Sequence, residues 1–390
     1  MKPFVDFFHR TELSLKCALG RSDKKLLSIL KERGQTHYAA ADYAGLDGMV
    51  EQLFTCKDNG IIPILGFEAF VNEYRPVEGK ELTFKNLSTG EIKQAEEMDE
   101  EERDLVTIDY PIGLFALDMT GYHNMMSVHN DAQLNGVWKR PRTSMSFLKG
   151  HGKGLLAVLR TPDSEVGSFI YSGEKEKALE KMQELLDMFE DVYLSVTIAK
   201  DRDLREIGAG VVEFADENGF KVIPVVNSHY LRPEDEKTWD TARRLAAISR
   251  SKGVMPFEID RAPDMSYHCR EEVDEIFSEY VESEAFGEER YEKCQAELDS
   301  LLQRFKLLDI DYSIKLPRFE NGEERLRKAA WDGFKRLGYD KMGDQYKERL
   351  EYELDNITGA GFANYFLIEE EVFDWYRKEK SPVVAVGRGS

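Results

Sequence analysis

The sequence predicts an α/β fold for residues 1 to about 270, followed by a mostly helical segment. Short apolar runs rich in β-branched residues alternate with amphipathic stretches, the pattern of repeated strand–helix units. Polar side chains also gather at the ends of several runs, where an α/β barrel carries its site, so a barrel is favoured over an open sheet. No Gly-x-Gly-x-x-Gly follows the first run, which counts against a dinucleotide-binding fold.

Five strands are expected in this first part of the chain. Each is a continuous apolar run of the kind that is buried on both faces of a parallel sheet. The expected strands are Thr36–Asp42, Ile61–Val71, Leu155–Leu159, Val192–Val196 and Val222–Val226. The amphipathic helices expected between them are Asp47–Asp58, Lys175–Phe189 and Leu204–Asn218.

The patterns divide the chain into a barrel over residues 1–270, a helical linker over 271–320 and a last region over 321–390. A polar, acidic stretch at about 72–109 interrupts the barrel and is expected to be a surface insertion, for which a hairpin with a short helix is one arrangement. From residue 271 the apolar residues recur with the spacing of a helix. The helices expected there are Glu271–Glu284, Glu288–Leu308, Glu323–Leu337 and Asp344–Thr358.

The composition excludes several classes of protein. The formal net charge of −21 argues against a broad nucleic-acid-binding face, because such binding comes from neutralising phosphates. No apolar run approaches the roughly 18–20 residues that span a bilayer, and Met1–Asp6 lacks the features of a signal peptide. The four cysteines form no Cys-x-x-Cys pair, so free thiols in a reducing cytoplasm are expected.

Several motifs follow one another in a distinctive order. They are Phe4–Leu15, Ala41-Asp42-Tyr43, Gly66–Val71, Asn227–Leu231, Gly361–Ile368 and Gly387-Arg388-Gly389-Ser390. Together they resemble the N-terminal part of the bacterial DNA polymerase III alpha subunits, a family of C-type replicative polymerases. The resemblance implies a distorted PHP (polymerase and histidinol phosphatase) barrel over 1–270, with Phe4–Leu15 as its opening strand. It also implies that residues 321–390 begin an α+β palm domain.

An active PHP site holds clustered divalent metal ions on histidines and carboxylates at the strand ends, and this sequence departs from that pattern. The opening His-x-His-x-His positions carry Asp6, Phe8 and Arg10, of which Phe8 cannot bind a metal and Arg10 repels one. Tyr43 stands where a histidine is expected. The resemblance therefore implies a relic site that holds no metal, formed by Asp6, Arg10, Asp42, Glu68 and His229.

Arg10 is the distinctive member of this expected relic site. Its cation is expected to replace the metal charge by pairing with Asp6, Asp42 or Glu68, because buried carboxylates need compensation. The family's later cysteine is replaced near Thr161, and Asn227 stands where it has an aspartate. The remaining histidines show no ligand spacing and are expected at the surface or at caps: His9, His37, His123, His129, His151 and His268.

The expected palm region ends in the turn Gly387-Arg388-Gly389-Ser390, which in the family helps to hold the phosphates of the incoming nucleotide. The paired catalytic aspartates, which bind Mg²⁺, follow this turn in the family and are expected beyond Ser390. Asp355 and Asp374 are expected to be solvated helix carboxylates. The chain by itself is thus expected to bind no cofactor and to be unable to polymerise DNA, whereas the full-length polymerase would need Mg²⁺.

The resemblance also implies the partners. A degenerate PHP domain would serve as support for the palm and as a docking surface for a proofreading exonuclease and other replisome subunits. DNA and deoxynucleotides would bind only in the full-length cytoplasmic polymerase, and no membrane is involved. Two alternatives are a PHP-type metal-dependent phosphoesterase or 3′–5′ exonuclease, and a non-enzymatic docking module for a proofreading exonuclease. The acidic insertion is either a partner surface or a solvated loop.

Overall fold

The structure of the protein is a computed structural model that describes residues 3–14, 24–77, 79–87, 89–137, 140–250, 264–279, 286–311, 313 and 317–379. The chain divides into two compact units, Met1–Asp309 and Ile310–Ser390. Among the described residues, no helix is long and apolar enough to cross a membrane.

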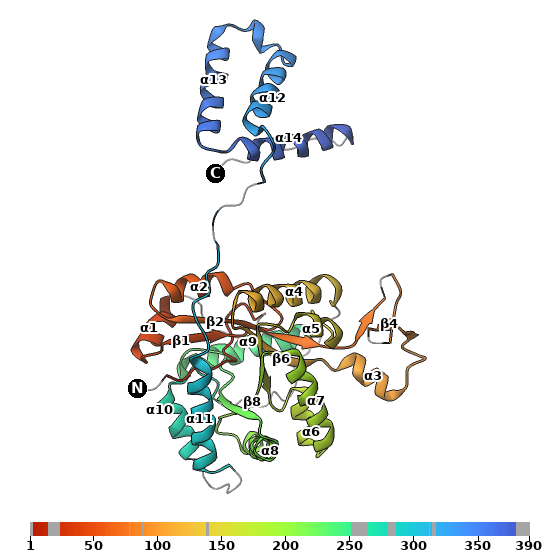
Figure 1. Cartoon of the computed structure of the whole chain (residues 1–390), viewed down its shortest axis with the longest axis vertical. Helices are drawn as coiled ribbons and strands as arrows, with labels where there is room; N and C mark the ends of the chain where they lie inside the picture. The colour runs from red at the N-terminus through yellow and green to blue at the C-terminus, as the bar shows by residue number, and fades with distance from the viewer. Residues whose placement is uncertain are drawn as a thin grey trace. The chain divides into compact units, whose positions relative to one another are not determined.

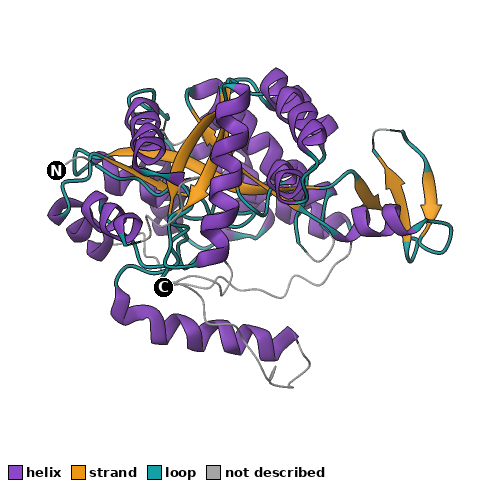
Figure 2. Ribbon diagram, turned by 90° about the horizontal axis from the view of Figure 1, so that it is seen from below, coloured by secondary structure: helices purple, strands orange, loops and turns teal. Residues whose placement is uncertain are grey.

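A six-stranded mixed sheet forms the centre of the first unit, with helices around it (Figures 1 and 2). Its strands, in spatial order, are β1 (His37–Ala40), β2 (Ile62–Val71), β6 (Tyr110–Ala116), β7 (Leu155–Arg160), β8 (Asp191–Thr197) and β9 (Lys221–Val225). The expected α/β class is confirmed, and the five expected strands are all present within one or two residues. Their carboxyl ends share one rim of the sheet, because all of them run in the same direction.

Strand β6 departs from the expected parallel sheet, because it runs antiparallel to both neighbours, β2 and β7. The reason lies in the connection before it. Val71, at the end of β2, pairs directly with Tyr110, at the start of β6, so the chain returns beside itself instead of crossing over through a helix.

Residues 3–14 lie between the two edge strands of the sheet. The amide of Ala41, after β1, donates to the carbonyl of His9 over 2.9 Å, and the amide of Arg10 donates to Ser228, after β9, over 2.8 Å. This segment draws the edges together, which makes the sheet a distorted barrel. The expected opening strand is wrong over residues 3–14, because the side chain of Asp6 accepts a hydrogen bond from the amide of Phe8 and turns the chain.

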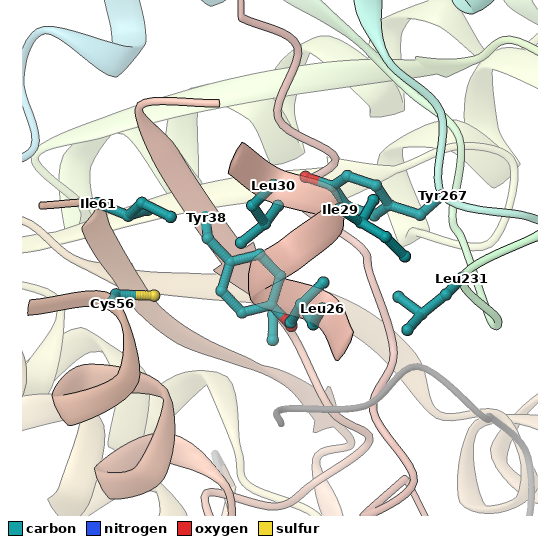
Figure 3. Close-up of a cluster of buried hydrophobic side chains, with 9 residues drawn as sticks. Leu26, Ile29, Leu30, Tyr38, Cys56, Ile61, Leu231 and Tyr267 are labelled. Atoms are coloured by element: carbon teal, nitrogen blue, oxygen red, sulfur yellow. The ribbon is translucent and has the colours of Figure 1, made fainter. Parts of the chain in front are cut away.

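The helices of the first unit pack their apolar faces on this sheet and on one another. Apart from α3 in the insertion, the described helices that precede α10 are α1 (Lys24–Glu32), α2 (Met49–Lys57), α4 (Met119–Asn135), α5 (Met145–His151), α6 (Glu165–Tyr171), α7 (Lys175–Met188), α8 (Arg202–Asn218) and α9 (Glu236–Arg250). Figure 3 shows how α1 packs: Leu26, Ile29 and Leu30 meet Tyr38 of β1 and Tyr267 in a buried cluster. The described cysteines, Cys56, Cys269 and Cys294, are free thiols, as expected.

The insertion between β2 and β6 is a small subdomain rather than a loop. It contains a three-stranded antiparallel sheet and one helix, with a core of its own. These elements are β3 (Tyr74–Pro76), β4 (Thr83–Asn86), β5 (Ile92–Gln94) and α3 (Glu100–Thr107). The core is formed by Tyr74, Phe84, Met98 and Val106, all of them buried.

Two further helices, α10 (Arg270–Ser278) and α11 (Glu288–Leu302), lie within the segment expected to be a linker, and both belong to the first compact unit. The second unit contains α12 (Gly322–Arg336), α13 (Asp344–Gly359) and α14 (Ala363–Lys378). Its helices share a core of Leu326, Leu354, Ala363 and Leu367.

Candidate functional site

The centre of the expected site is Glu68, a fully buried carboxylate on β2. Nη2 of Arg10 lies 3.0 Å from its Oε2 atom, and Nε of Arg160, at the end of β7, donates to its Oε1 atom over 3.0 Å. Burial raises the pKa of Glu68, but the two guanidinium groups outweigh it and hold the pKa below its ordinary value. Glu68 is therefore a charged carboxylate held between two cations.

Arg10 is itself enclosed by aromatic rings. Its guanidinium carbon lies 4.1 Å from the ring centroid of Tyr43 and 5.4 Å from that of Phe8. Its side chain is fully buried, and its nitrogens form no hydrogen bond within the described protein, so charge and cation–π contacts hold it. Phe8 and Tyr43 thus pack their rings against the buried cation of Arg10.

Asp6 accepts five hydrogen bonds, one from Phe8 in its own segment and four from the segment after β9. Its Oδ1 atom accepts from the amides of Phe8, Val226 and Asn227, over 3.1, 3.3 and 3.2 Å. Its Oδ2 atom accepts from the amide and the hydroxyl of Ser228, over 2.7 and 2.6 Å. The four donors after β9 fix the turn that follows this strand, so the role of Asp6 is to join the N-terminal segment to the last strand.

Asp42 follows β1 and binds the other side of the N-terminal segment. Its Oδ1 atom accepts from the amide of Thr11 over 2.8 Å and from the hydroxyl of Ser14 over 2.5 Å. Its Oδ2 atom accepts from the hydroxyl of Thr11 over 2.6 Å. Asp6 and Asp42 together attach residues 6–14 to both edges of the sheet.

His229 completes the group. Its Nδ1 atom lies 2.8 Å from the carbonyl of Asn227, and its Nε2 atom lies 3.4 Å from the hydroxyl of Tyr43. Burial, followed by the nearby charge of Arg10, lowers the pKa of His229 to about 3. Asn227 adopts a left-handed backbone with φ of 61°, a conformation that asparagine tolerates better than most residues. His229 is therefore a neutral imidazole at physiological pH.

The carboxylates and the histidine at this rim do not fit the requirements of a metal cluster. The oxygens of Asp6 and Asp42 already accept hydrogen bonds, Glu68 lies between two guanidinium groups, and His229 is close to Arg10. Among the residues that the structure describes, no group of three or more His, Cys, Asp or Glu side chains could hold a metal ion. A divalent cation would also be repelled by Arg10 and Arg160.

The structure brings all five expected residues to the rim that the carboxyl ends of β1, β2, β7 and β9 share, and it adds Arg160, which the sequence reasoning missed. The sequence could have indicated Arg160 by its position, because it directly follows the apolar run Leu155–Leu159 and precedes Thr161. His9 corrects another expectation, because it is fully buried and its Nδ1 atom lies 2.9 Å from the hydroxyl of Ser228. Burial lowers the pKa of His9 to about 4. His268 is also buried rather than at the surface.

The expected nucleotide-binding turn, Gly387 to Ser390, lies outside the described residues. The two helix carboxylates before it are ordinary surface groups. Asp355 pairs with Arg327 over 2.5 Å, and Asp374 pairs with Arg377 over 2.6 Å. Their side chains are 69% and 49% exposed, as expected for solvated carboxylates.

Comparisons with known proteins match both parts of the chain. Residues 9–199 match the PHP domain family, and residues 324–390 match the bacterial DNA polymerase III alpha NTPase domain. Three similar curated relatives are the DNA polymerase III alpha subunits of Helicobacter pylori, Aquifex aeolicus and Bacillus subtilis, which are 27%, 27% and 23% identical. The alignments cover 100%, 100% and 94% of this chain, and 32%, 32% and 29% of those relatives. A solved amidohydrolase from Chromobacterium violaceum is 12% identical to this chain. The superposition covers 58% of this chain and 87% of the amidohydrolase chain, with a TM-score of 0.35.

The curled sheet, the residues at its rim and the family match define the first unit as a PHP domain. It is followed by sequence of the polymerase III alpha NTPase domain. The chain belongs to the DNA polymerase III alpha subunit family and corresponds to the N-terminal region of these proteins. It spans about a third of the length of the curated relatives named above.

Proposed function

We propose that this region acts as a structural and docking part of a replicative DNA polymerase, and that its PHP site is a metal-free charge cluster. The observation that supports this most directly is the buried triplet of Arg10, Glu68 and Arg160. In a PHP hydrolase the carboxylates at this rim are neutralised by metal ions. Here two guanidinium groups supply the compensating charge, and a buried carboxylate needs such a partner.

Nucleotidyl transfer would belong to the whole polymerase. In that protein, Mg²⁺ would be held by aspartates that follow the Gly387–Ser390 turn in the family, and the turn would contact the nucleotide phosphates. DNA and deoxynucleotides would bind there, in the cytoplasm. The 390-residue chain is expected to give no primer extension with any divalent metal.

The partners we propose are a proofreading exonuclease subunit and other subunits of the replisome. Support comes from the family assignment and from the nature of the rim, which is built for stability rather than for hydrolysis. A barrel whose strand ends are fixed by Asp6, Asp42 and Glu68 presents a rigid surface, and rigid surfaces bind partners at a small entropic cost.

Elemental analysis of the purified chain tests the proposal. Zinc, manganese and iron are expected at well below one equivalent, and chromogenic phosphodiesters are expected to stay intact. A stoichiometric metal whose removal by a chelator abolishes phosphodiester hydrolysis would overturn the proposal and favour a PHP phosphoesterase instead. The variant Arg160→Gln is a useful second sample, because metal uptake by this variant alone would show that charge is what excludes the ion.

A further inference from the structure

A cavity of about 820 Å³ is lined by residues of helices α10 and α11. Five carboxylates line it, against the single guanidinium of Arg270: Asp274, Glu275, Glu288, Glu292 and Asp299. Arg270 already contacts Asp274 over 3.3 Å and Asp299 over 3.4 Å. The other three carboxylates pair with no cation among the described residues. The cavity therefore carries uncompensated negative charge.

Two further observations point to a ligand. Gln295 lines the cavity and is 1% exposed, and its Oε1 atom has no hydrogen-bond partner within the described protein. Its Nε2 atom is already engaged, because it donates to the hydroxyl of Tyr291 over 2.5 Å. A buried acceptor without a donor is costly, so a group that donates hydrogen bonds would be stabilised beside it.

The aromatic wall of the cavity suits the same chemistry. Phe277 of α10 and Tyr291 of α11 stack with ring centroids 3.9 Å apart and an angle of 7° between their planes. Tyr291 is oriented by its hydroxyl, which donates to Asp274 over 2.7 Å. The stacked pair is buried and makes a rigid wall beside the carboxylates, and the planar N–H groups of a guanidinium match a carboxylate better than an ammonium does.

We propose that the α10–α11 cavity binds an arginine-rich segment of a partner protein. The volume is large enough for more than one side chain, the lining is acidic, and Arg270 shows that a guanidinium fits between its carboxylates. None of the residues that line this cavity belongs to the PHP rim, so the site goes beyond the proposed scaffold function.

The test is fluorescence anisotropy with a labelled peptide of six arginines. The variant Ala296→Arg places a tethered guanidinium in the cavity, because Ala296 is exposed and lines it. Peptide binding is expected to weaken at least about tenfold, since a cation would then occupy the site and repel another. The matched control is Ser300→Arg, which adds the same charge on the exposed side of α11 outside the lining residues and is expected to change the affinity less than about twofold.

Two triple variants, each of which removes three carboxylate charges, provide a second comparison. Glu275→Gln, Glu288→Gln and Glu292→Gln together are expected to weaken binding. The matched set Glu180→Gln, Asp187→Asn and Glu213→Gln, on exposed positions of α7 and α8, is expected to leave it unchanged. Equal losses in the cavity and control variants would overturn the proposal, because they would show attraction to the overall charge of −21. Displacement of the peptide by spermidine at equal cation concentration would also overturn it, in favour of a polyamine site.

Discussion

The buried carboxylate of Glu68 is paired with the guanidinium group of Arg10. A carboxylate inside a barrel must be compensated, whether by metal ions or by cations from the chain. Arg10 supplies that charge from the N-terminal segment and Arg160 supplies it from β7. The guanidinium carbons of both arginines lie near the ring of Phe8, 5.4 and 5.9 Å from its centroid, so this ring packs beside both cations.

Replacing Arg10 by methionine is expected to lower the free energy of unfolding by about 3 kcal/mol, measured by urea denaturation. This is the lower end of the cost of breaking a buried ion pair, because Arg160 still contacts Glu68. Adding Glu68→Gln to the same protein should recover part of the loss, since the buried charge is then gone. A loss below about 1 kcal/mol for Arg10→Met would contradict a buried pair.

His229 gives the site a pH dependence. Its pKa is about 3 in the folded chain against an ordinary value of 6.5, so the unfolded chain binds more protons between these values. The stability that the folded chain gains by keeping His229 neutral is therefore complete above pH 6.5, and it is lost as the pH falls toward 3. We expect His229 to contribute about 1 kcal/mol per pH unit to the fall in the free energy of unfolding between pH 6 and pH 4, in addition to a contribution of the same sign from His9.

The variant His229→Asn should make this pH profile flatter, because asparagine can still donate to the carbonyl of Asn227 and does not titrate. The exposed His123 provides the control, and His123→Asn should keep the original slope. An unchanged profile in His229→Asn would show that another group, such as His9, carries the effect.

At the scale of the elements, the insertion is attached to the barrel through buried polar contacts. The side-chain amide of Asn72 donates to the carbonyls of Leu105 and Ile108, over 2.6 and 2.8 Å. Arg142, which is 2% exposed, contacts the carbonyl of Val106 and the carboxylate of Asp109. These contacts hold the end of α3 against the strand ends, so the subdomain is expected to be well ordered rather than a solvated loop.

Asn72→Ala is expected to loosen this attachment at a cost of about 1 kcal/mol, because the part-buried carbonyls of Leu105 and Ile108 lose their donor. Hydrogen exchange should report the effect locally, with faster exchange of the amides of α3 and no change in α7. Asn124→Ala removes one exposed amide contact, to the carbonyl of Lys153, and serves as the control. Uniformly faster exchange over the whole first unit would contradict a local role.

At the scale of the whole molecule, the charge of −21 opposes contact with DNA. Binding of a labelled duplex to this chain at physiological salt is expected to be no tighter than about 1 µM, within the range of non-specific binding, when followed by fluorescence anisotropy. The physical reason is that phosphate binding releases counterions only where cations neutralise phosphates. A submicromolar affinity with a steep salt dependence would reveal a basic face that the composition hides.

The family and most of the barrel strands could be predicted from the sequence, because buried parallel strands are continuous apolar runs and can be recognised locally. Strand β6 could not, since its direction depends on how the insertion returns the chain beside β2. The pairing of Arg10 was predicted as a choice among three carboxylates, and the structure selects Glu68. Asp6 and Asp42 were expected as partners of the same kind, but each is occupied by donors from the chain.

The sequence by itself determined which residues could meet at the rim: Asp6, Arg10, Asp42, Glu68 and His229 were all named from their motif positions. These residues could be recognised because each stands in a short motif that is read from the local sequence alone. Only the tertiary structure decided which of these residues contact one another, because Glu68 and the two arginines beside it come from segments up to 150 residues apart. Arg160 is the clearest case, since an arginine after an apolar run is an ordinary strand end until the sheet curls and places it 3.0 Å from Glu68.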